Sequence, residues 1–85
     1  MKVYKYNLEI TDEQEIPIGG FVDVLSVGVQ NEKLVLYAMV NPDNYAVWDV
    51  KVRIVGTGHN TDLDEGFKFV GTHMMLNGIV WHVWW

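Results

Sequence analysis

The segment from Arg53 to His59 combines residue types that can bind an anion. A strand that ends in Gly56-Thr57-Gly58 lets backbone N–H groups converge, and such nests bind phosphate or carboxylate. Arg53 adds a guanidinium that can donate two parallel hydrogen bonds to a phosphate, and His59 adds a donor that titrates near neutral pH. The rest of a G-x-G-x-x-G or P-loop motif is missing. A tight bend made by two glycines is therefore the competing interpretation.

Two further histidines raise the question of a metal site. If the Asn-Gly pair at 77–78 forms a two-residue hairpin, His73 lies directly opposite His82, within reach of one shared ion. A third ligand would have to come from His59 or from the acids of residues 62–65, and no local spacing positions it. We therefore expect a solvated or hydrogen-bonded histidine pair, with no metal and no other cofactor.

Catalytic chemistry has few candidates in this chain. The acidic stretch 60–66 alternates like a calcium loop, but Glu65 occupies the place of the required glycine and Gly71 that of the bidentate glutamate. Ser26 is the only serine and lacks a Gly-x-Ser-x-Gly elbow, and the chain has no cysteine nucleophile. We therefore expect a binding protein and not an enzyme.

Aromatic residues are abundant, with four tryptophans, four tyrosines and three phenylalanines. Most should fill the core, but Trp81 and Trp84 have opposite parity on one strand and must point to opposite faces. At least one indole then faces a partner subunit or a flat ligand. Tyr6 and Trp48 are the aromatic residues that we expect to stack on such a flat ligand. We also expect a homo-oligomer, because the Trp84-Trp85 end needs cover.

Length and composition limit the class of protein. The 85 residues suffice for one domain, which we place at residues 1–85. About half of them (49%) are apolar, whereas 11 acids against 6 bases give a net charge of −5, which argues against a sequence-independent grip on duplex nucleic acid. No apolar run approaches the roughly 20 residues of a membrane span, and the polar alternation at residues 4–10 differs from the apolar core of a signal segment. We expect a soluble cytoplasmic protein without a membrane partner.

The elements that must position these residues are strands. Polar and apolar residues alternate with a period of two over residues 4–10 and 48–54, which is typical of half-buried strands. No window shows the period of an amphipathic helix with caps. The sequence therefore predicts an all-β fold, a small single-domain antiparallel β-sandwich or open barrel of six or seven short strands.

Two hairpins are predicted from turn residues. Asn31-Glu32 lies between two apolar runs, and a two-residue turn there pairs positions whose numbers sum to 63. The Asn-Gly pair at 77–78 predicts a second two-residue turn, with pairs that sum to 155. The first register places six aliphatic residues on the core face: Leu25, Val27, Val29, Leu34, Leu36 and Ala38.

Five segments carry a family resemblance, in order along the chain: residues 4–14, 25–31, 53–59, 70–72 and 80–83. Together they look like a family of small bacteriophage proteins. The opening Tyr-Lys-Tyr block and the Gly-Thr-Gly-His segment are the most specific parts. Two departures are visible: the family usually has Asn-Gly at the first hairpin, and it tends to end in Phe and an acid in place of two tryptophans.

This phage family is similar to the anti-CBASS sponge proteins, which bind and sequester the cyclic nucleotide signals of bacterial anti-phage defence. The resemblance implies immune evasion in the host cytoplasm, by tight binding without cleavage of a cyclic dinucleotide such as cyclic GMP-AMP. The ligand-binding residues that we expect are Arg53, Gly56, Thr57, Gly58, His59, Tyr6 and Trp48. The alternative is a protein-binding inhibitor or a minor phage assembly protein that acts through an exposed aromatic face.

Overall fold

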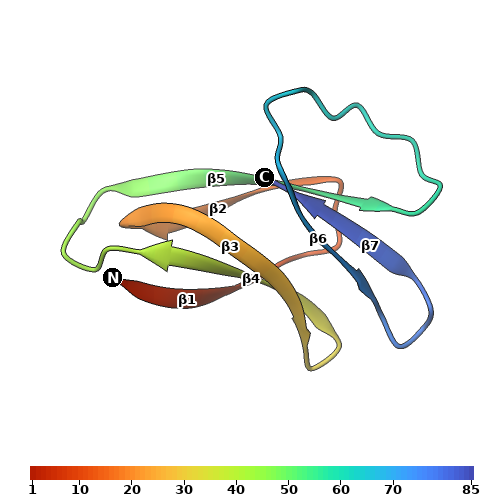
Figure 1. Cartoon of the computed structure of the whole chain (residues 1–85), viewed down its shortest axis with the longest axis horizontal. Coiled ribbons are helices and arrows are strands. Elements are labelled where there is room, and N and C mark those ends of the chain that lie inside the picture. The colour runs from red at the N-terminus through yellow and green to blue at the C-terminus, as the bar shows by residue number, and fades with distance from the viewer.

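Seven antiparallel strands without a helix make up the computed structural model, which describes residues 1–85 (Figure 1). The strands are β1 (Lys2–Asn7), β2 (Glu13–Gly19), β3 (Phe21–Gln30), β4 (Lys33–Val40), β5 (Val47–Gly56), β6 (Phe69–Met74) and β7 (Val80–Trp84). The predicted all-β class is confirmed. The structure has no helix that is long and apolar enough to cross a bilayer.

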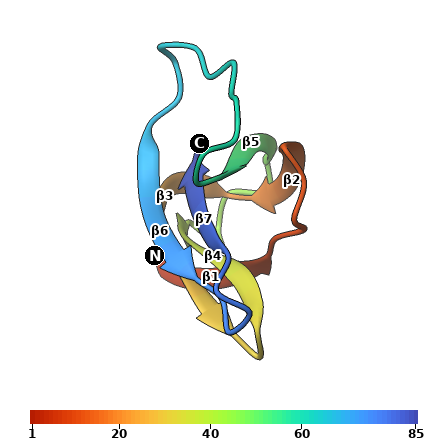
Figure 2. The same ribbon diagram turned by 90° about the vertical axis from the view of Figure 1, so that its right-hand side faces the viewer.

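The strands form two sheets, with the orders β1-β4-β3 and β2-β5-β7-β6 (Figures 1 and 2). The sheets approach each other at one side, where β3 lies against β6. There a Cβ added to Gly71 would lie 2.9 Å from a methyl group of Val27, and the His73 Nε2 lies 2.8 Å from the Val27 carbonyl oxygen. At the other side β1 and β2 remain edge strands. The fold is therefore a sandwich that is tight along one side and does not close into a barrel.

Residues from both sheets share one hydrophobic core. Most come from the alternating inner positions of β4 and β5, the central strands of the two sheets, and Leu36, Val52 and Val83 are fully buried. The predicted core positions on β4 are confirmed. The core consists of Leu8, Ile18, Val24, Val27, Leu34, Leu36, Ala38, Val40, Val50, Val52, Ile54 and Val83.

The first hairpin follows the predicted register only near its turn. Asn31 (φ 52°) and Glu32 (φ 62°) form the two-residue turn, and the five adjoining pairs sum to 63. Two β-bulges on β3 then shift the register. Leu25 was predicted in the core, but it lies at a bulge with 46% of its surface exposed, and Val24 is buried instead. Val29, close to the turn on an edge strand, is also exposed.

The second hairpin differs from prediction by one residue. The Gly78 N–H donates to the Met75 carbonyl (2.9 Å) and Gly78 has φ 86°, so the loop has three residues and ends in a glycine bulge. Asn-Gly suits this loop as well as a two-residue turn, and the pairs beside it sum to 154. The shift places His73 opposite Trp81 and separates it from its predicted partner, His82.

Candidate functional site

The Gly56-Thr57-Gly58-His59 segment is a closed turn. The His59 N–H donates to the Gly56 carbonyl (3.0 Å), and Gly58 has φ 82°, as the third residue of a type II turn requires. The His59 ring lies directly on Gly56, where an added Cβ would be 2.6 Å away, and meets the Trp81 ring edge-on. The Thr57 N–H donates to a carbonyl of β7 (3.3 Å). Two of the predicted nest donors are therefore engaged within the protein.

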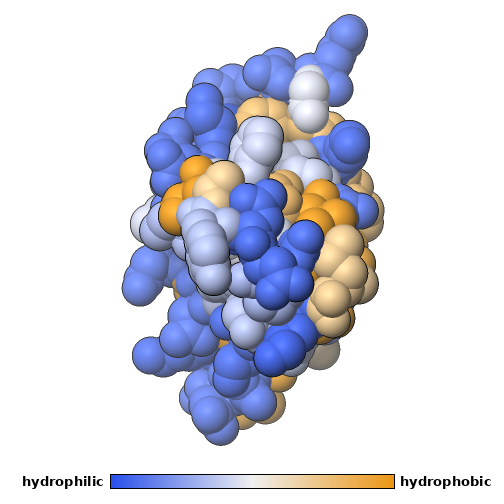
Figure 3. Space-filling view, turned by 90° about the vertical axis from the view of Figure 1, so that its left-hand side faces the viewer, coloured by the Kyte–Doolittle hydropathy of each residue, from blue (hydrophilic) through white to orange (hydrophobic).

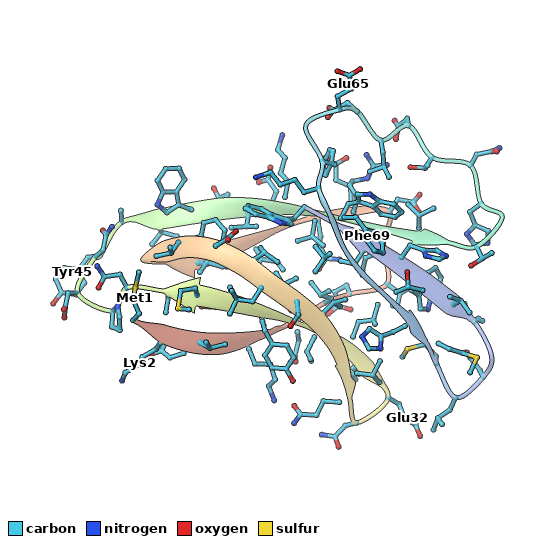
Figure 4. All side chains as sticks on the ribbon, viewed as in Figure 1. Met1, Lys2, Glu32, Tyr45, Glu65 and Phe69 are labelled. Carbon is cyan, nitrogen blue, oxygen red and sulfur yellow. The ribbon has the colours of Figure 1, made fainter.

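Arg53 lies on β5, shortly before this turn, and its side chain connects the loop between β5 and β6 to the sheet. Its Nε donates to the Asp12 carbonyl (2.7 Å), its Nη2 donates to the Asp62 carboxylate (2.6 Å), and the guanidinium lies 5.7 Å from the Phe67 ring centroid. The bond with Asp62 raises the pKa of Arg53, and it lowers the pKa of Asp62. The Arg53 side chain is only 12% exposed, whereas that of Asp62 is 89% exposed. Glu65 marks the outer end of the loop (Figure 4).

Arg53 and Trp48 line one groove with a volume of about 610 Å³. Trp48 is 57% exposed near the start of β5, beyond the part of the strand that faces the core. Tyr6 does not reach this groove, because it lies on β1 and packs against the core, where burial raises the pKa of its hydroxyl. The structure thus brings together two of the predicted ligand residues and leaves Tyr6 and the Gly56–His59 turn outside the groove.

Three aromatic residues of the groove were missed by sequence reasoning: Phe21, Phe67 and Trp85. Phe21 and Trp85 meet edge to face with ring centroids 5.5 Å apart, and the Lys68 ammonium lies 5.2 Å from the Trp85 ring. Trp85 has the same parity as Trp81, which packs against the core, and this parity was the available signal. Phe21 had none, because the bulge that follows it on β3 sets its register, and Phe67 had none, because its place depends on how the loop before β6 folds.

Trp84 and His82 lie on the outer face of β7. Trp84 lies there, with its ring 5.3 Å from that of Phe69, whereas Trp81 packs against the core, so the two indoles point to opposite faces as predicted. The His82 ring shares hydrogen bonds with the Thr57 hydroxyl (2.7 Å) and the Thr72 hydroxyl (2.8 Å). His82 therefore has partners on both ring nitrogens.

Comparison with known families identifies the chain as a whole. A family model described as a domain of unknown function (DUF7352) matches residues 1–85. The chain belongs to this family. No curated protein and no solved structure matches it significantly. The match spans every strand, and the groove therefore lies entirely within the family domain.

Acidic side chains dominate the rim of the groove. Glu13, Asp49, Asp62 and Asp64 line it together with only two cations, Lys51 and Arg53. Arg53 already has Asp62 as its partner. At the end of the molecule where β5 begins, apolar and hydrophilic side chains are interspersed (Figure 3). The groove thus combines an aromatic floor with a rim that repels anions and attracts cations.

Proposed function

We propose that the protein binds and sequesters a small nucleotide without cleaving it, in the groove lined by Trp48 and Arg53. One observation carries the proposal: Trp48, which we expect to stack on a base, and Arg53, which we expect to bind a phosphate, line the same groove. Its volume of about 610 Å³ lies within the range of small-molecule sites. Aromatic faces stack on any base, and a guanidinium forks onto phosphate.

A phosphate that binds Arg53 competes with Asp62, whose carboxylate already accepts a hydrogen bond from the Arg53 Nη2. Asp62 is the partner to be replaced, because its exposed carboxylate is solvated and screened as soon as it leaves. The second bond, from the Arg53 Nε to the Asp12 carbonyl, keeps the guanidinium oriented during the exchange. Asp62 therefore acts as an internal competitor for an anionic ligand.

The proposed ligand class is a cyclic dinucleotide such as cyclic GMP-AMP, and the proposed role is to remove this immune signal from the host cytoplasm. The resemblance to phage sponge proteins supports the class. Two planar bases match a groove with more than one aromatic wall, formed by Trp48, Phe21 and Trp85. Self-association, which we also propose, would place several such grooves in one assembly.

Calorimetric titration with cyclic GMP-AMP and a panel of cyclic and linear nucleotides tests this function. Arg53→Ala should weaken binding by about 1.5–3 kcal/mol, the usual value of a charge-assisted hydrogen bond. Asp62→Asn should tighten it by removing the competitor, and Lys2→Ala, a cation outside the groove, should leave it unchanged. Absence of nucleotide binding to the intact protein, full-strength binding to Arg53→Ala, or recovery of cleaved ligand would each refute the proposal.

A protein-binding function is the second candidate. It is favoured by a specific observation, the four carboxylates on the groove rim, which disfavour a dianion and suit a cationic partner. The exposed Trp48 is also a suitable anchor for a protein interface.

A further inference from the structure

The strand β5 lacks a neighbour along half of one side. β2 pairs with it from Val47 to Arg53 on one side, whereas on the other side β7 pairs only from Arg53 to Gly56. In Figure 1, β7 reaches β5 about midway along that strand, near the C label. The stretch Val47–Lys51 therefore forms an open edge inside the four-stranded sheet, directly beside the groove.

Backbone groups of this stretch point to the open side. On the β2 side, the Ala46 carbonyl accepts a hydrogen bond and the Ile54 N–H donates one, whereas the Thr57 N–H donates to β7. Backbone N–H and C=O groups alternate in direction along a strand. Those of the odd-numbered residues of β5 therefore point toward β7 or toward the space beyond its end. The residues whose N–H and C=O groups face the open space are Val47, Asp49 and Lys51.

We propose that this edge binds an extended, basic peptide segment of another protein by β-strand addition. The segment would run antiparallel to β5 and continue the line of β7. Peptide residues opposite Trp48 and Val50 would point inward, toward the aromatic groove with Phe21. Peptide residues opposite Asp49 and Lys51 would point outward. The expected partner therefore alternates apolar and polar side chains.

The charge of the rim selects the polar residues of the partner. Four carboxylates line the groove, and of its two cations Arg53 is already paired with Asp62. The protein as a whole carries a net charge of −5. A basic peptide residue opposite Asp49 would gain attraction that an acidic residue would lose, whereas the peptide residue opposite Lys51 should be polar and uncharged, because like charges directly opposite are destabilising.

The outer edge of the same sheet at β2 is less suited to such pairing. On β2, Gln14, Ile16 and Ile18 lie opposite the β5 residues whose backbone groups bond toward β2, so their own N–H and C=O groups point to β5. The N–H and C=O groups of the odd-numbered β2 residues therefore point away from the sheet. One of these outward positions is Pro17, which has no N–H to donate. The open stretch of β5 has no proline and presents all of its donors.

A second copy of the chain fits this edge poorly. Two copies that pair along the whole stretch Val47–Lys51 would place Asp49 opposite Asp49 of the other copy, and like charges directly opposite are destabilising. Shifting the copies either shortens the pairing or runs one copy into the end of β7, where Trp84 pairs with Arg53. A partner of different sequence avoids both conflicts.

Binding of two synthetic heptapeptides to the intact protein tests the inference. Both alternate valine with polar residues and carry threonine opposite Val47 and Lys51, and they differ only opposite Asp49, where one has lysine and the other glutamate. We expect the lysine peptide to bind at least about tenfold more tightly, and to slow hydrogen exchange at the Asp49 and Lys51 amides. Equal or tighter binding of the glutamate peptide would overturn the inference. Protection confined to β1 or β2 would also overturn it.

Proline variants provide a matched pair. Lys51→Pro removes an N–H donor that points to the open side of β5 and leaves the hydrogen bonds between β5 and β2 in place. It should abolish peptide binding. Glu15→Pro makes the same change on the outward side of β2 and should leave binding intact. Should either proline variant fail to fold, Asp49→Lys serves instead and should reverse the preference between the two peptides.

Two other results would overturn the inference: full-strength peptide binding to Lys51→Pro, or a dimer of the intact protein that Lys51→Pro converts to monomer. The nucleotide proposal stands or fails separately, because its tests act on the Arg53 guanidinium and these act on the backbone of β5. Loss of peptide binding with retained nucleotide binding, or the reverse, identifies which proposal has failed.

Discussion

Glu32→Gly should stabilise the protein by about 1 kcal/mol. Glu32 has φ 62°, and an L-residue in this left-handed conformation costs about 1–2 kcal/mol. Its side chain is exposed and forms no hydrogen bond or ion pair, so its removal loses little. Glycine relieves the steric cost but makes the unfolded chain more flexible, which offsets about 0.4–1 kcal/mol of the gain.

Urea and thermal unfolding followed by far-ultraviolet circular dichroism measure this effect. A gain of 1 kcal/mol should raise the Tm by about 4–8 °C in a domain of this size. Glu32→Ala is the matched control, because it removes the carboxylate and keeps the left-handed strain, so its stability should stay near that of the original protein. Gly78→Ala is the inverse control. Gly78 has φ 86° and free space around its Cβ position, and should lose about 1 kcal/mol.

Two results would refute this reasoning. If Glu32→Ala stabilised the protein as much as Glu32→Gly, the charge of Glu32 and not its backbone conformation would be the cause. If Glu32→Gly left the urea midpoint unchanged while Gly78→Ala lowered it, the strain at the first turn would be negligible.

Three further predictions concern the core, the seam between the sheets and the long loop. Ile54→Ala should lower the free energy of unfolding by about 2–5 kcal/mol, because Ile54 is fully buried, and urea unfolding measures the loss. Gly71→Ala should cost about 1–3 kcal/mol by the same assay, since the new methyl group would lie 2.9 Å from Val27. Asp62 has a lowered pKa, so it contributes stability above its unfolded pKa of about 4 that is lost as the pH falls through its folded pKa. Asp62→Asn should therefore flatten the acid limb of the stability profile, and an unchanged limb would show that the Arg53 contact is absent in solution.

Local patterns predicted the fold class and part of its detail. The period of two over residues 48–54 predicted a half-buried strand. Its alternating apolar residues Val50, Val52 and Ile54 are buried, whereas Trp48, which has the same parity, is 57% exposed. Asn31-Glu32 identified the first turn and the register next to it. These features depend on each residue and its immediate neighbours, through side-chain alternation and backbone φ preferences. They can therefore be predicted from the sequence.

The candidate site was only partly predictable. Arg53 and Trp48 were expected at a ligand site, and the structure places both in one groove. The Gly56–His59 turn was expected beside them, but it lies outside the groove, and two of its N–H donors are engaged within the protein. A glycine pair suits both a nest and a closed turn, and the choice depends on what packs around it, here the His59 ring against Trp81.

The sequence by itself determined that the chain forms strands, which residues of β4 and β5 face inward, and where the chain turns, because each of these follows from nearby residues. Only the tertiary structure decided the bulges at Leu25, the register of the second hairpin and the partners of Arg53. Arg53 bonds to Asp12, 41 residues away, and the His73 ring bonds to Val27, 46 residues away. Such contacts form when sheets pack and loops close, and packing selects one register among several that the local sequence allows equally.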